Sequence, residues 1–145
     1  MSITNNNAKL ICGLTYGTNS STIYRELVNT MGFDPSKINC FGSRRPLYAV
    51  NADTTRNLDV WFICYTNYDY DNEIVNICES LNAVNCICRD GDYIIEVVDE
   101  KYGSAHNAQR ITFIKNGQGQ YEFLGVFVLI ENGKSRIYKR VSKTY

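Results

Sequence analysis

The dipeptide Asn132-Gly133 constrains this chain most, because it separates two strand-like runs. The run before it, Tyr121 to Glu131, is long and apolar, and Ser135 to Val141 follows it. Asn-Gly between such runs is the strongest short-range signal for a β-hairpin. We therefore predict that the two runs pair as antiparallel strands.

A two-residue loop at Asn132-Gly133 would also fix the register of this hairpin. It places Leu129 opposite Arg136 and Gly125 opposite Arg140. Because side chains alternate between the two faces of a strand, Ile137 and Val141 would then face inward. The other face, which we call the basic face, carries Lys134, Arg136, Tyr138 and Arg140.

The basic face has two interpretations. Arginine binds phosphate groups bidentately and tyrosine offers a stacking surface, so the strand could bind nucleic acid or a partner protein. Arg44 and Arg45 would extend this surface if the fold brings them near. Alternatively, the strand is a solvated edge, since edge strands carry Lys and Arg that discourage pairing with other chains.

The remaining pattern predicts an α+β fold. Two helices, Thr22 to Met31 and Asn72 to Asn82, are expected to pack on a mostly antiparallel sheet that can curl into a partial barrel. Ser20 or Ser21 would cap the first helix. Further strands are expected at Lys9 to Thr15, Leu58 to Tyr65, Val84 to Cys88, Tyr93 to Val98 and Arg110 to Lys115. Residues 1–145 suit a single domain, with a flexible N-terminus at residues 1–8.

Charge and composition narrow the environment and the partner. The formal net charge is zero, which argues against a bulk polyanion binder but allows a local basic patch. The N-terminal stretch MSITNNNAK lacks the features of a signal peptide, and no apolar run reaches the length of a membrane span. We therefore expect a cytoplasmic protein without membrane contact, in which the six cysteines are reduced and mostly buried.

A glycine-rich turn, Gly13 to Ser21, joins the first expected strand to the first helix. The free amides of a helix N-terminus bind anions, so Gly17, Thr18, Ser20 and Ser21 form a candidate anion site. The turn matches neither the Walker motif nor the dinucleotide-binding fingerprint. It is therefore interpreted either as a capped turn or as a phosphate cradle.

Other chemistry-bearing residues do not assemble into a catalytic or metal-binding set. Asp69, Asp71 and Glu73 alternate in an acidic loop, but the glycine and distal glutamate of a calcium loop are missing. The single histidine, His106, would need a nearby thiolate that sequence spacing cannot place. Cys86 and Cys88 are one pair, which is too few for a zinc site. We therefore expect no catalytic residues, no cofactor and no metal.

Three functions remain open. The first is a non-enzymatic binding module that acts on nucleic acid, or on an enzyme that handles nucleic acid, through the basic face. The second is a small phage-type inhibitor that binds a host defence enzyme by protein–protein contact, using some of the eleven tyrosines as anchors. The third is a small nucleotide-binding protein or enzyme that uses the Gly13–Ser21 turn and His106.

Overall fold

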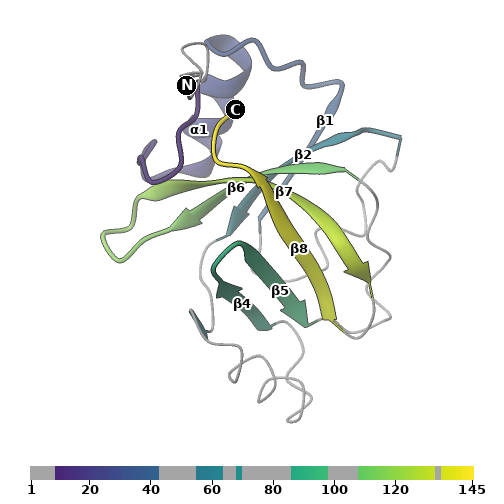
Figure 1. Ribbon diagram of the computed structural model, residues 1–145. Coiled ribbons are helices and arrows are strands. Elements are labelled where there is room, and N and C mark those ends of the chain that lie inside the picture. Colours follow the sequence, from purple (N-terminus) through teal and green to yellow (C-terminus); the bar gives the residue numbers. More distant parts are fainter. Residues whose placement is uncertain (1–8, 43–54, 64–67, 70–85, 98–107, 133–134) are drawn as a thin grey trace, which may run out of the picture.

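The computed structural model describes residues 9–42, 55–63, 68–69, 86–97, 108–132 and 135–145 (Figure 1). Within these residues, a helix packs on a strongly twisted sheet. The elements are α1 (Ser20–Asn29), β1 (Ile38–Gly42), β2 (Leu58–Ile63), β3 (Tyr68–Asp69), β4 (Cys86–Asp90), β5 (Tyr93–Val97), β6 (Gln109–Lys115), β7 (Tyr121–Asn132) and β8 (Ser135–Ser142). The second expected helix, the flexible N-terminus and His106 lie outside the described residues.

The strands form one sheet in the order β1-β2-β6-β7-β8-β5-β4-β3. The pairs β1–β2, β2–β6 and β3–β4 are parallel. The pairs β6–β7, β7–β8, β8–β5 and β5–β4 are antiparallel. The class of mixed helix and sheet is confirmed. The expectation of a partial barrel is wrong, because the sheet stays open between β1 and β3, and both of its ends contain parallel pairs.

Helix α1 begins at Ser20 and ends at Asn29, two residues before the predicted start and end, Thr22 and Met31. Asn19, not Ser20 or Ser21, is the cap, and its side-chain oxygen accepts a hydrogen bond of 3.1 Å from the amide of Thr22. Asn is as good a cap as Ser, so the correction changes the residue and not the mechanism. The helix then buries Ile23 and Leu27 against the sheet.

The sheet buries apolar residues on both of its faces. On the α1 side lies an apolar core, which includes Val60 and Phe62 of β2 and Ile111 and Phe113 of β6. The alternate residues of the same strands face the other side, where Trp61, Ile63 and Ile114 are buried. Strand β2 is therefore covered on both faces, as its continuous apolar run predicts.

Two segments near α1 differ from the prediction. The run Lys9 to Thr15 makes two isolated bridges, Ile11 with Thr144 and Thr15 with Glu122, instead of a regular strand. Strand β1 lies where the sequence analysis assigns no strand, and it pairs with β2 in parallel. Parallel pairing joins segments far apart in the chain, so no local hairpin signal marks it.

The hairpin of β7 and β8 is confirmed, but its register is not the predicted one. Tyr138, not Arg136, pairs with Leu129, and Arg136 pairs with Asn132. The register shifts between Leu129 and Glu131, as at a β-bulge. An irregularity of this kind changes which residues of the second strand face inward.

Candidate functional site

Two residues of the basic face predicted from the sequence, Arg136 and Tyr138, are buried. Arg136 is 2% exposed and Tyr138 is 1% exposed, whereas Val141, which was expected in the core, is 53% exposed. The two faces of β8 are therefore inverted relative to the prediction, as the register of the hairpin requires. Lys134, Arg44 and Arg45 lie outside the described residues.

Arg140 is half-buried and its guanidinium holds several parts of the structure together. Its Nε atom donates to Asp92 Oδ1 at 3.0 Å, and its Nη1 atom donates to the carbonyl oxygen of Leu124 at 3.1 Å. The same Nη1 atom lies 3.5 Å from the sulfur of Cys12. We conclude that Arg140 links β8 to the β4–β5 turn, to β7 and to the N-terminal segment.

A group of buried ionisable residues, the ionic cluster, occupies the sheet face opposite α1. It comprises Asp59, Glu96, Arg110, Arg136 and Tyr138, all buried. Arg110 Nε lies 3.3 Å from Asp59 Oδ2, and Arg136 Nη1 lies 3.9 Å from Glu96 Oε1. These charges come from β2, β5, β6 and β8, so the cluster joins strands across most of the sheet.

Aromatic rings enclose the guanidinium of Arg110. Its central carbon lies 4.8 Å from the centre of the Trp61 ring and 4.5 Å from that of Tyr138. A cation over a ring face is attracted by the ring quadrupole, more strongly where water is excluded. The arrangement explains how a sheet face can bury an arginine, and it favours a structural role for this charge.

Burial also shifts the pKa values of two groups in the cluster. Desolvation raises the pKa of Glu96 above its ordinary value, although Arg110, Arg136 and the nearby Tyr138 hydroxyl oppose the change. Desolvation likewise raises the pKa of Tyr138 to about 12. The Tyr138 hydroxyl is buried beside the Glu96 carboxyl group, but it forms no hydrogen bond of full geometry with any residue that the structure describes.

Tyr138→Phe should therefore change stability at neutral pH by no more than about 1 kcal/mol, because a hydroxyl without a hydrogen bond of full geometry does little to offset the cost of its burial. In the wild type, the folded state retains the Tyr138 proton between the ordinary pKa of 10.0 and about 12, so stability falls as pH rises through this window. The variant should lose that contribution. Urea unfolding between pH 7 and 11 measures both effects. Tyr93→Phe, on an exposed residue, controls for hydroxyl loss, and strong destabilisation by Tyr138→Phe would contradict the prediction.

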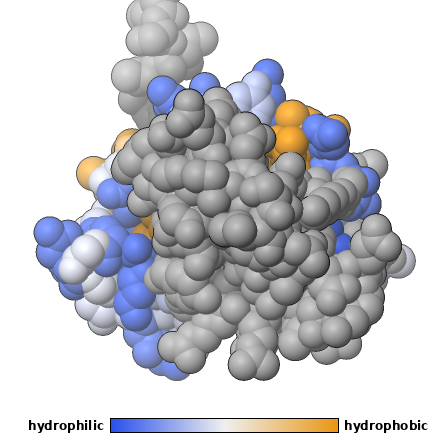
Figure 2. Space-filling model, turned by 90° about the horizontal axis from the view of Figure 1, so that it is seen from below, coloured by the Kyte–Doolittle hydropathy of each residue, from blue (hydrophilic) through white to orange (hydrophobic). Residues whose placement is uncertain are grey.

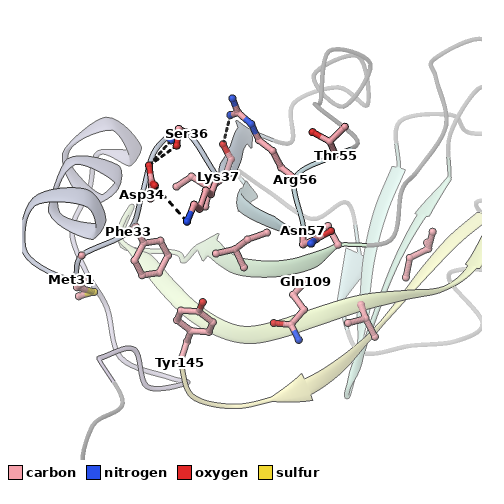
Figure 3. A pocket seen from close by; sticks show the side chains of 16 residues that line it. Met31, Phe33, Asp34, Ser36, Lys37, Thr55, Arg56, Asn57, Gln109 and Tyr145 are labelled. Carbon is pink, nitrogen blue, oxygen red and sulfur yellow. Dashed lines mark hydrogen bonds and ion pairs between the residues drawn. The ribbon is translucent and has the colours of Figure 1, made fainter.

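A groove of about 1060 Å³ opens at the end of the sheet where β1, β2 and β6 begin. Figure 3 shows Phe33 and Tyr145 together at one end, with Asn57 and Gln109 further along. The rings of Phe33 and Tyr145 are in contact, with centroids 5.5 Å apart. Apolar residues also line the groove: Met31, Ile38, Leu58, Ala108, Val128 and Leu129.

A polar wall borders the groove on the side of the Asp34–Ile38 segment. Asp34 accepts hydrogen bonds from the amide and hydroxyl of Ser36, at 2.9 and 2.7 Å, and these bonds lower the pKa of Asp34. Arg56 Nη1 donates to the carbonyl oxygen of Ile38 at 2.7 Å. Lys37 is exposed and reaches only 4.0 Å from Asp34. The wall is therefore held by Asp34 and Arg56, and Lys37 faces solvent.

The candidate anion site remains a prediction. The backbone of Gly17 is fixed to β7, since its carbonyl oxygen accepts a hydrogen bond of 2.7 Å from the amide of Tyr121. The amide of Thr22 already donates a hydrogen bond to the Asn19 side chain. Ser20 and Ser21 instead line a smaller hollow of about 470 Å³ beside α1.

The acidic loop residues Asp71 and Glu73 lie outside the described residues, and so does the side chain of Asp69. Cys12 and Cys40 are both free thiols. Within the described part of the chain, no three potential metal ligands gather, and no helix has the length and apolar character needed to cross a bilayer. Where described residues are visible from below, they are mainly hydrophilic, and apolar residues form only small groups (Figure 2).

Comparison with known proteins identified no relative of this chain. No protein-family model matches the chain, and no similar curated protein or solved structure was found. The groove carried no signal in the sequence, because its lining comes from five separate segments that only the parallel pairing of β1, β2 and β6 brings together.

Proposed function

We propose that this protein is a non-enzymatic binding module that holds a segment of a partner protein in the groove. The observation that carries the proposal is the lining, which combines aliphatic and aromatic side chains with exposed polar side chains such as Asn57 and Gln109. Protein interfaces combine an apolar centre with a polar rim in this way. A small inhibitor of an enzyme, including one that handles nucleic acid, would act through such contacts.

The ionic cluster favours a protein partner over nucleic acid. Binding to a phosphate backbone depends on exposed cations. Arg136 is buried, and Arg140 is bonded to Asp92 and to the backbone. The net charge of zero adds no general attraction for a polyanion. Of the cations expected to contact nucleic acid, those in the described residues serve the fold instead.

The proposal is tested by blocking the groove without disturbing the core. Gln109 is exposed and lines the groove, so Gln109→Arg should obstruct it. Gln118 is also exposed but lies in the β6–β7 turn, at the other end of β6, so Gln118→Arg is the matched control. We expect Gln109→Arg to weaken binding of the partner from nuclease-treated lysate by about tenfold or more, which corresponds to about 1.4 kcal/mol of binding free energy. The Gln118→Arg control should bind the partner as the wild type does.

Two results would contradict this function. Equal capture by wild type and Gln109→Arg would show that the groove is not the binding surface. Capture that disappears on nuclease treatment would show that nucleic acid, not protein, is the ligand. Thermal unfolding of both variants checks that the arginine has not altered the fold.

A further inference from the structure

We infer that the segment held in the groove is extended, carries acidic side chains and presents aliphatic side chains between them. This inference rests on the proposed function and specifies the chemistry of the partner. Three features of the groove support it: the apolar floor, the cationic side of the rim and the amide groups at the sheet end.

The floor selects apolar side chains. Leu58 and Val128 are only partly buried, although both belong to strands that also contribute residues to the core. Val128 pairs with Gln109 in the sheet, so the floor continues directly into the polar rim. An aliphatic side chain inserted here would remove both surfaces from water. A nucleotide backbone has no group that gains from such a floor.

The rim carries more cationic than anionic side chains. Among the lining residues, Lys37 and Arg56 carry positive charge and Asp34 carries the one negative charge. Asp34 accepts hydrogen bonds from Ser36 within its own turn, and the exposed Lys37 amine lies 4.0 Å from the Asp34 carboxylate. Lys9 adds a further cation at the Met31 end, where its amine donates to the Met31 carbonyl oxygen at 3.0 Å. This excess of positive charge favours acidic side chains in the bound segment and speeds their association.

The amide groups suit an extended peptide. Asn57 and Gln109 are adjacent and exposed, and the Gln109 backbone amide donates to the Asn57 carbonyl oxygen at 3.1 Å. Each side-chain amide offers donors and an acceptor, so the pair can bind both the N–H and the C=O of a peptide backbone. The volume of about 1060 Å³ lies at the upper limit for small-molecule pockets, which also favours a chain segment.

The test uses short fluorescein-labelled peptides and fluorescence polarisation with the full chain. The probes are a peptide pool that alternates Asp or Glu with Leu, Ile or Val, the same pool with Lys in place of the acids, and single-stranded oligothymidylate. We expect the acidic pool to bind most tightly and to weaken as salt rises. Lys37→Glu should weaken it by about tenfold or more and should improve binding of the Lys-containing pool, because it replaces a positive charge of the rim by a negative one.

Lys115→Glu is the matched control, since Lys115 is exposed at the opposite end of β6 from Gln109, and it should leave binding unchanged. Tighter binding of the Lys-containing pool or of oligothymidylate to the wild type would overturn the inference. So would the absence of peptide binding, or an equal loss with Lys37→Glu and Lys115→Glu. If Gln109→Arg still blocks capture of a partner protein in those cases, only the acidic chemistry is wrong. If it does not, the groove proposal fails as well.

Discussion

Replacing Asp59 by alanine should lower the free energy of unfolding by about 3–5 kcal/mol, because it removes one partner from a buried ion pair. Asp59 is fully buried, lies 3.3 Å from Arg110 Nε and accepts a hydrogen bond of 3.0 Å from the side-chain amide of Asn39. Without the carboxylate, the guanidinium of Arg110 keeps its charge in a site where water is excluded. Chemical denaturation of wild type and variant measures the difference.

A second variant distinguishes loss of the pair from loss of packing. Replacing both partners of a buried ion pair by apolar side chains is often neutral, so Asp59→Leu with Arg110→Met should cost clearly less than Asp59→Ala alone. The introduced methionine would keep an apolar chain between Trp61 and Tyr138, the rings that enclose the guanidinium. A double variant as unstable as the single one would mean that Arg110 does not depend on Asp59. Asp59→Ala with wild-type stability would refute the pairing itself.

The same ion pairs explain why the faces of β8 could not be predicted. Local patterns treat Arg136 as a surface residue, because arginine is rarely buried unless it is paired. Its partner Glu96 lies on β5, and Asp59 and Arg110 are likewise far apart in the chain. No window of the sequence contains both members of a pair. Ile137 and Val141 therefore looked like the inward residues, although Val141 is largely exposed.

What could be predicted depended on local signals. The apolar run beginning at Leu58 gave β2, the spacing of Ile23 and Leu27 gave α1, and the turn residues around Asn132-Gly133 gave the β7–β8 hairpin. Strand β1 and the parallel pairs depend on contacts between distant segments. The groove depends on the same contacts, so the sequence predicted most of the elements but not the surface that they create.

The close approach of β8 to Gly125 makes this glycine the most restrictive backbone position described in β7. Its φ angle is +128°, and a Cβ atom added there would lie 2.5 Å from the carbonyl oxygen of Ser142 and 2.7 Å from Cδ of Arg140. The sequence predicted that Gly125 would lie opposite Arg140. That register is wrong, because Arg140 pairs with Phe127, but the Arg140 side chain still lies beside Gly125. Glycine is required because both the conformation and the space exclude a side chain.

Gly125→Ala should therefore destabilise the protein by roughly 2–6 kcal/mol, the sum of backbone strain and overpacking at about 1–3 kcal/mol each. Gly117→Ala is the control, because Gly117 has no positive φ and a Cβ atom there meets nothing within 4 Å. Its stability should change little or rise by up to about 1 kcal/mol. Since the Arg140 side chain can move but the Ser142 backbone cannot without breaking its pairing with Val126, Gly125→Ala with Arg140→Ala should recover only part of the loss. Full recovery would assign the clash to the arginine alone, and a harmless Gly125→Ala would show that β7 and β8 are not this close.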